Sequence, residues 1–94
     1  MPKAVWHGQV IAQSDDVLVV DGYAYFPKRD VNWHLLEESP HRSVCSWKGE
    51  ARYYSVRLDG SADTDAAWEY ADPKPAAAMV RDRVGFWRGV EIEQ

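Results

Sequence analysis

The sequence has little cysteine, no long apolar run and no excess of basic residues, and each shortage excludes a class of protein. Cys45 is the only cysteine among 94 residues, so no intramolecular disulfide can form. Small secreted domains usually depend on such bonds. No stretch approaches the ~20 apolar residues of a membrane span, and none near residue 1 is long enough for a signal peptide. We therefore expect a soluble, cytoplasmic protein with no membrane partner.

The charge balance argues against a nucleic-acid partner. Eleven Lys and Arg residues stand against 15 Asp and Glu, which gives a net charge of −4. The basic residues are scattered along the chain, and no run of them is longer than two. Nucleic-acid-binding proteins usually carry a basic surplus, because neutralising phosphates supplies much of their affinity. We expect no nucleic-acid partner.

What the chain does have is large aromatic side chains. Five Trp, five Tyr and two Phe residues occur in a chain the size of one domain. A short chain buries only a modest share of its surface, so bulky rings help it to form a stable core. No linker, low-complexity segment or long repeat divides the sequence. We expect residues 1–94 to form a single domain.

The apolar pattern is short and mostly alternates, which is typical of strands. Asp21-Gly22 and Asp59-Gly60 predict hairpin turns, and residues 37–42 read as a loop. Residues 17–20 look apolar enough to be buried on both faces. Two helical turns are expected, one over residues 31–36 with Asp30 as N-cap and one over residues 76–80 after Pro75. The expected strands cover residues 4–6, 9–13, 17–20, 23–26, 43–47, 52–58, 66–70, 84–87 and 90–92, and the last two form a hairpin across Arg88-Gly89. The sequence thus predicts a mainly β domain of seven to nine short antiparallel strands with one or two short helical turns.

Six short sequence motifs, in their order along the chain, resemble those of a known family. They are Trp6-His7-Gly8, Tyr25-Phe26-Pro27, residues 43–49 (SVCSWKG), residues 51–56 (ARYYSV), residues 67–76 (AWEYADPKPA) and residues 84–90 (VGFWRGV). Together they resemble the bacterial family known as domain of unknown function 427, over nearly the whole chain. The resemblance implies a compact β-tent-like fold and carries a nucleotidyltransferase-like label. β-Tent relatives usually hold a structural zinc with two Cys-x-x-Cys pairs, which this sequence lacks.

Cys45 is the one candidate nucleophile. A reactive thiolate needs a nearby positive charge, which Lys48 or Arg42 could supply, and a base such as His34 or His41. Free cysteine, however, more often packs as a small buried hydrophobe. The alternative to catalysis is a core position beside Val44.

Metal and nucleotide chemistry lack a convincing pattern. His34, His41 and Cys45 match no standard zinc spacing. Residues 60–65 (GSADTD) contain the Gly-Ser and Asp-x-Asp elements of a nucleotidyltransferase, but they are adjacent rather than on separate elements, and turn chemistry explains each residue. We expect no metal and no cofactor.

The most informative region is polar and aromatic. On a strand, Tyr53, Ser55 and Arg57 share one face, and Trp68 and Tyr70 share another with Glu69 opposite. Lysines beside turns could bring charge over such a surface. The candidate ligand-binding residues are Trp47, Lys48, Tyr53, Ser55, Arg57, Trp68, Tyr70 and Lys74.

Three functions remain open at this point. The first is a module that binds a small molecule or peptide in an aromatic, partly basic pocket. The second is a small enzyme that uses Cys45 or a Tyr-Lys pair, and the third is a homodimer or larger oligomer joined by exposed aromatics. For the pocket residues, the plain alternative is a solvated sheet face.

Overall fold

The computed structural model describes residues 1–94 and contains nine strands and three short 3-10 helices. The strands are β1 (Lys3–Trp6), β2 (Gln9–Gln13), β3 (Leu18–Val20), β4 (Tyr23–Pro27), β5 (Leu36–Cys45), β6 (Gly49–Leu58), β7 (Ser61–Glu69), β8 (Arg83–Phe86) and β9 (Glu91–Glu93). The helices are η1 (Lys28–Asp30), η2 (Trp33–Leu35) and η3 (Pro75–Val80). None of these helical segments has the length and apolar character needed to cross a membrane.

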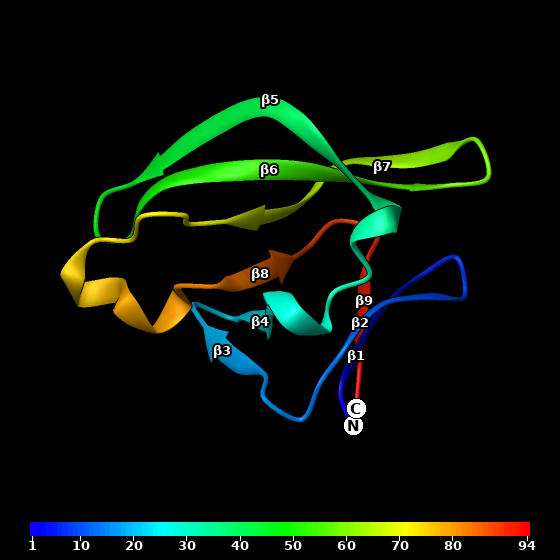
Figure 1. The fold of residues 1–94 in the computed structure, drawn as a ribbon, viewed down its shortest axis with the longest axis horizontal. Helices are drawn as coiled ribbons and strands as arrows, with labels where there is room; N and C mark the ends of the chain where they lie inside the picture. The colour runs from blue at the N-terminus through cyan, green and yellow to red at the C-terminus, as the bar shows by residue number, and fades with distance from the viewer.

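The strands form two antiparallel sheets (Figure 1). The larger sheet has the order β3-β4-β8-β7-β6-β5, and the smaller has the order β2-β1-β9. In Figure 1 the small sheet lies to the right of β3 and β4, and both chain ends lie beside it. The prediction of a mainly β fold with seven to nine antiparallel strands is confirmed.

Two Asp-Gly pairs form the tight hairpin turns that their sequence predicts. Asp21 and Gly22 have φ values of 53° and 83°, and Asp59 and Gly60 have values of 49° and 81°. Two consecutive positive φ angles match the twist of a two-residue hairpin, and Asp and Gly tolerate them best. These turns join β3 to β4 and β6 to β7.

The large sheet separates two apolar cores, because alternate residues of its strands point to opposite faces. In β4, Phe26 belongs to the larger core and Tyr25 to the smaller one; in β7, Ala67 and Trp68 are divided in the same way. The larger core also contains apolar residues of the small sheet. The smaller core is completed by residues of η3 and is rich in aromatic rings.

Lys48 and Glu69 are the two charged residues that are buried. The Glu69 carboxylate accepts a hydrogen bond from Lys28 Nζ at 2.8 Å and one from the Tyr54 hydroxyl at 2.6 Å. Burial and the neighbouring Glu69 carboxylate both raise the pKa of Tyr54. A buried charge is costly unless it is paired and hydrogen-bonded, and these two contacts stabilise the negative charge of Glu69.

The prediction of a loop over residues 37–42 is wrong, because these residues lie within β5. Glu37 and Glu38 pair with Ser55 and Tyr54 of β6. β5 is an edge strand of the sheet, where charged residues and proline are tolerated and hinder pairing with other chains. The register shifts between Glu38 and Arg42, so three residues including Pro40 face one residue of β6. A β-bulge of this kind accommodates the proline.

Three smaller expectations are also corrected. The last two strands do not form a hairpin, because β8 pairs with β4 and β7 whereas β9 pairs with β1. Val19 is 66% exposed, since β3 is the other edge strand and is not buried on both faces. Asp30 is not the cap of the helical turn: it ends η1, and Asn32 precedes η2.

Candidate functional site

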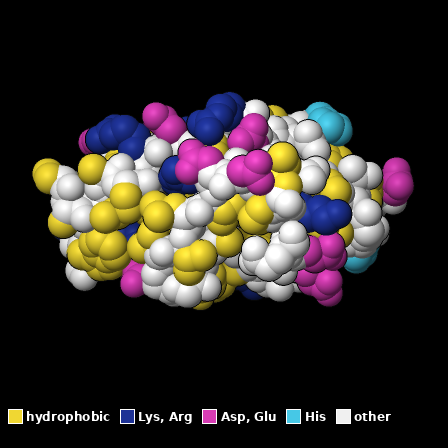
Figure 2. Space-filling view, turned by 90° about the horizontal axis from the view of Figure 1, so that it is seen from below, with side chains coloured by type: hydrophobic (Ala, Val, Ile, Leu, Met, Phe, Trp, Pro, Cys, Tyr) yellow, Lys and Arg dark blue, Asp and Glu magenta, His cyan; other side chains and the backbone are white.

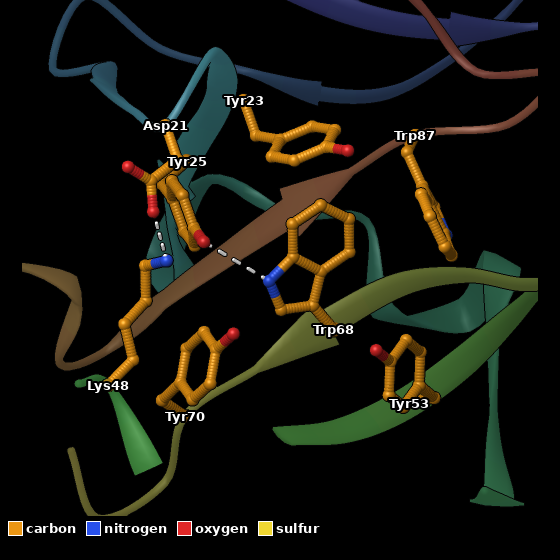
Figure 3. A pocket seen from close by; sticks show the side chains of 8 residues that line it. All are labelled: Asp21, Tyr23, Tyr25, Lys48, Tyr53, Trp68, Tyr70 and Trp87. Carbon is orange, nitrogen blue, oxygen red and sulfur yellow. Dashed lines mark hydrogen bonds and ion pairs between the residues drawn. The ribbon is translucent and has the colours of Figure 1, made fainter. Parts of the chain in front are cut away.

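A pocket opens into the smaller, aromatic core. It has a cavity volume of about 160 Å³ and is lined by Asp21, Tyr23, Tyr25, Lys48, Tyr53, Trp68, Tyr70 and Trp87. Figure 3 shows these side chains converging from the β3–β4 turn, β4, the β5–β6 turn, β6, β7 with the residue after it, and the residue after β8. Six of the eight are aromatic. The pocket therefore combines segments that are far apart in the sequence.

Trp68 lies at the centre of the aromatic walls (Figure 3). Its ring meets those of Tyr23, Tyr25 and Trp87 edge to face, with centroid distances of 5.1, 5.8 and 5.7 Å. Tyr53 lies further away, at 6.5 Å and a tilt of 40°. Edge-to-face contacts of this kind stabilise the cluster beyond the area that it buries. The walls are thus held in place before any ligand arrives.

An ion pair between a buried lysine and an exposed aspartate closes one end of the pocket. Lys48 Nζ donates to Asp21 Oδ2, and the Lys48 side chain is 6% exposed whereas that of Asp21 is 53% exposed. The hydrogen bond from Lys48 holds the pKa of Asp21 below its usual range. Burial is the largest influence and acts to lower the pKa of Lys48, but the bond to Asp21 together with the charges of Asp21, Tyr25 and Cys45 outweighs it and the pKa is raised. Both groups are therefore charged at neutral pH.

Two tyrosine hydroxyls lie near this ion pair (Figure 3). The Tyr25 oxygen accepts a hydrogen bond from Trp68 Nε1 at 3.2 Å, which leaves its own proton free to be donated. The Tyr70 hydroxyl has no hydrogen-bond partner within the chain, and Lys48 Nζ lies 5.9 Å from the Tyr70 ring centroid. Burial raises the pKa of both phenols, so each stays protonated at neutral pH. This end of the pocket thus offers mainly hydrogen-bond donors.

Glycine makes the close packing around Trp68 possible. A Cβ at Gly85 of β8 would lie 2.6 Å from Cζ2 of Trp68, well inside contact distance. Because Gly85 pairs with Trp68 across the ladder, the indole can lie flat over the backbone of β8. The residue type at position 85 therefore decides where the central wall of the pocket lies.

Of the eight residues predicted to bind a ligand, the structure brings four together in this pocket: Lys48, Tyr53, Trp68 and Tyr70. Trp47 lies just outside, with its ring centroid 4.5 Å from Lys48 Nζ. The alternation that placed Trp68 and Tyr70 on one face, opposite Glu69, is present. Strand periodicity thus identified Tyr53, Trp68 and Tyr70, and Lys48 was predicted from its place beside a turn.

The other three predicted residues make contacts elsewhere. Ser55 Oγ accepts the backbone N–H of Asp65 at 3.1 Å. Arg57 pairs with Glu37 at 3.6 Å, and Lys74 Nζ donates to the backbone oxygen of Ser46 at 2.7 Å. Ser55 and Arg57 do not line the pocket because the register of β6 and β7 shifts between Tyr54 and Val56, and the face is not continuous beyond this point. Lys74 lies after β7, directly before η3, and its side chain reaches the β5–β6 turn instead.

Sequence reasoning missed Asp21, Tyr23, Tyr25 and Trp87 as lining residues. A signal existed for the two tyrosines, because alternation in 23–26 places them on one face of a strand. Asp21 reads locally as a turn residue, and its φ of 53° confirms that role. Its second role as the partner of Lys48 depends on a contact across 27 positions of the chain. Trp87 directly precedes the expected turn at Arg88-Gly89, so its sequence position predicts a role in that turn as readily as one in a pocket.

Cys45 lies beside the pocket rather than in its wall. It packs against the aromatic core, and its Sγ lies 3.8 Å from Lys48 Nζ. Burial acts to raise the pKa of its thiol, but hydrogen bonds from the backbone of Trp47 and Lys48 outweigh burial and the pKa is lowered. Neither His34 nor His41 hydrogen-bonds to it; His41 instead lies against the Tyr53 ring at 4.6 Å. The Cys45 thiol thus ionises more readily than an ordinary cysteine, but it has no paired base.

The surface shows no block of like charge on the face drawn in Figure 2, where acidic and basic side chains are interspersed and apolar ones gather toward one end. The exposed large apolar side chains of the chain include Val19, Val44, Trp47 and Met79.

Residues 60–65, which contain the Gly-Ser and Asp-x-Asp elements, make structural contacts: the Asp63 carboxylate accepts the backbone N–H of Gly89 at 2.8 Å. No group of three or more His, Cys, Asp or Glu side chains is placed to hold a metal ion.

Comparison with known proteins assigns a family. No curated protein matches the chain. Residues 2–94 match the family described as "Domain of unknown function (DUF427)", which is essentially the whole chain. The chain therefore belongs to the DUF427 family.

Proposed function

We propose that the protein is a binding module that holds one flat ring of a small ligand, or of a peptide side chain, in the aromatic pocket. The observation that carries the proposal is a preformed hollow with six aromatic side chains in its wall and a buried ammonium group at one end. Apolar walls with a few convergent polar groups are the usual composition of a ligand site. Tyr23 is 39% exposed, so a ligand can enter the pocket from solvent beside this side chain.

The volume limits the size of the bound group. Pockets for drug-sized ligands occupy roughly 300–1,000 Å³, whereas an apolar cavity of about 150 Å³ accepts one benzene molecule. The pocket here measures about 160 Å³. It therefore fits a single ring, and the rest of a larger molecule must extend into solvent past Tyr23.

The donor-rich end selects the substituent on that ring. Lys48 and the hydroxyls of Tyr25 and Tyr70 offer protons, and the one nearby carboxylate, that of Asp21, already binds Lys48. A carbonyl or carboxylate oxygen would satisfy these donors, whereas an ammonium group would meet the charge of Lys48. We therefore assign the ligand as a one-ring compound that carries a hydrogen-bond acceptor.

Fluorescence titration with three one-ring probes tests the assignment. Trp68 and Trp87 line the pocket and report on occupancy. Benzamide and benzoate carry an acceptor, whereas benzylamine carries a cation on the same ring. We expect benzamide and benzoate to bind with a Kd on the order of a millimolar, because a ligand with few atoms can gain only a small binding free energy. Benzylamine should bind at least about tenfold more weakly. Equal binding of all three would refute the role of the donor end.

Two variants locate the site. Tyr23→Ala removes a partly exposed wall, and Tyr70→Phe removes one free hydroxyl without changing the volume. Tyr54→Phe is the matched control, because its hydroxyl is bonded to Glu69 outside this pocket. We expect the first two variants to weaken benzamide binding and the control to preserve it. If all three bind benzamide like the original protein, the ring lies elsewhere and the proposed function fails.

A further inference from the structure

Two arginines face each other directly on the outer part of the large sheet. Arg42 of β5 and Arg52 of β6 are cross-strand partners, and both are exposed. Like charges in opposite positions destabilise a strand pair. None of the six ion pairs in the structure includes either arginine. On its other side Arg52 faces Glu69 across the β6–β7 ladder, but that carboxylate already binds Lys28 and Tyr54, so neither arginine has an ion-pair partner of its own.

The two guanidinium groups border a hollow of their own. Its volume is about 240 Å³, and it is lined by Glu38, Ser39, Arg42, Arg52, Tyr53 and Tyr54. It lies where the β5–β6 register shifts, so three residues of β5 face Tyr53 alone. The β-bulge thus forms a concave, polar site on a strand that would otherwise be flat.

The donors of this hollow are oriented and largely unused. Nη1 of Arg42 donates to the backbone oxygens of Ser39 and His41 at 2.9 and 2.8 Å, which fixes the guanidinium against the bulge. Its Nε and Nη2 groups remain free. Arg52 makes no hydrogen bond with the chain, so all its N–H groups are available. The Ser39 hydroxyl accepts the N–H of His41 and retains its own proton.

We infer that this hollow is a second binding site, distinct from the aromatic pocket, that takes a phosphate group, either free or as a monoester. A phosphate has enough oxygens to bind both guanidiniums at once, each through paired hydrogen bonds. Its double negative charge offsets both arginines. A carboxylate is a weaker match, because Glu38 already places one beside the site without pairing with either arginine.

The experiment follows the arginine side-chain Nε–H signals by NMR while inorganic phosphate is added at constant ionic strength. Arg52→Gln is the test variant. Arg57→Gln is the matched control, since Arg57 lies on the same strand but pairs with Glu37 outside the hollow. We expect saturable shifts of the Arg42 and Arg52 signals and a loss of affinity of about tenfold or more in Arg52→Gln. Arg57→Gln keeps the affinity of the original protein.

Thermal unfolding gives an independent readout. Arg52→Gln removes both the like-charge contact with Arg42 and the favourable contact with Glu69 on the neighbouring strand, so its Tm without phosphate serves as the baseline for that variant. With phosphate, the original protein gains more in Tm than the variant, since a ligand stabilises the state that binds it. Phosphate also stabilises proteins generally, so the difference between the two proteins is the quantity that counts.

Two further probes identify the anion. Tighter binding of methyl phosphate, which has no ring for the aromatic pocket, than of inorganic phosphate assigns a monoester, and the reverse assigns the free ion. Acetate is the carboxylate probe, and equal shifts with acetate would overturn the assignment to phosphate. An equal response of Arg52→Gln and the original protein to phosphate would overturn the site itself. Neither outcome bears on the aromatic pocket.

Discussion

Gly85→Ala tests whether the central wall of the aromatic pocket depends on a missing side chain. The backbone of Gly85 does not have a positive φ, so alanine is conformationally allowed there. Its Cβ, however, would lie 2.6 and 2.7 Å from Cζ2 and Cε2 of Trp68. Carbon atoms prefer separations of about 3.5–4.0 Å. The indole must therefore move by about 1 Å, against Tyr23 and away from its bond to Tyr25.

The expected cost follows from two opposing effects. Overpacking in a core typically costs about 1–3 kcal/mol, and the rigid ring places this case at the upper end. Replacing glycine by alanine in a strand recovers about 0.5–1 kcal/mol of backbone entropy. The net loss in the free energy of unfolding should be about 2 kcal/mol, which lowers Tm by about 8–16 °C in a domain of this size.

Urea unfolding of four proteins checks this reasoning: the original, Gly85→Ala, Trp68→Leu and the double variant. Once the indole is removed, the added methyl group has nothing to displace, so Gly85→Ala should become neutral or stabilising in the Trp68→Leu background. A loss below about 0.5 kcal/mol in the original background would refute the argument. So would an equal loss in both backgrounds, because it would place the strain elsewhere.

Three other predictions concern the charged groups and the thiol. Glu69→Gln removes the charge that binds Lys28 and Tyr54, and we expect a loss of about 1–3 kcal/mol in urea unfolding; an unchanged midpoint would contradict a structural role. Because the folded pKa of Asp21 lies below its ordinary value, its contribution to stability is present above that value and is lost as the pH falls through the folded pKa. Asp21→Asn should therefore show a shallower loss of Tm below about pH 4 than the original protein, and parallel curves would exclude the effect. The lowered pKa of Cys45 predicts that alkylation by iodoacetamide rises with pH earlier than for an ordinary thiol, and Lys48→Met should delay this rise; identical profiles for the two proteins would remove Lys48 from the explanation.

The features that the sequence predicts well are local. Asp21-Gly22 and Asp59-Gly60 predict hairpin turns, because few residue pairs tolerate two positive φ angles. Alternation in β7 separates Trp68 from Glu69, since successive side chains of a strand point to opposite faces. These short-range rules are enough for the fold class and for half of the pocket lining.

The features that it does not predict depend on distant partners. Residues 37–42 hold two glutamates and a proline, and only pairing with β6 makes them a strand. The sequence does not predict that Lys48 is buried, because its burial depends on Asp21, which the β3–β4 turn places against it. The destination of β9 is equally hidden, because nothing in Glu91–Glu93 says that it pairs with β1 rather than with β8.

The pairing of β1 with β9 has a consequence for the order in which the protein acquires its structure. Lys3 faces Glu93, so this ladder joins two segments at opposite ends of the chain. A ribosome makes β1 and β2 early, and β1 then keeps one unpaired edge until almost every other residue has been made. An unpaired edge is a template for association with other chains. The nascent chain should therefore be most prone to aggregate just before β9 emerges, and a circular permutant that places β9 directly before β1 should shorten this exposure.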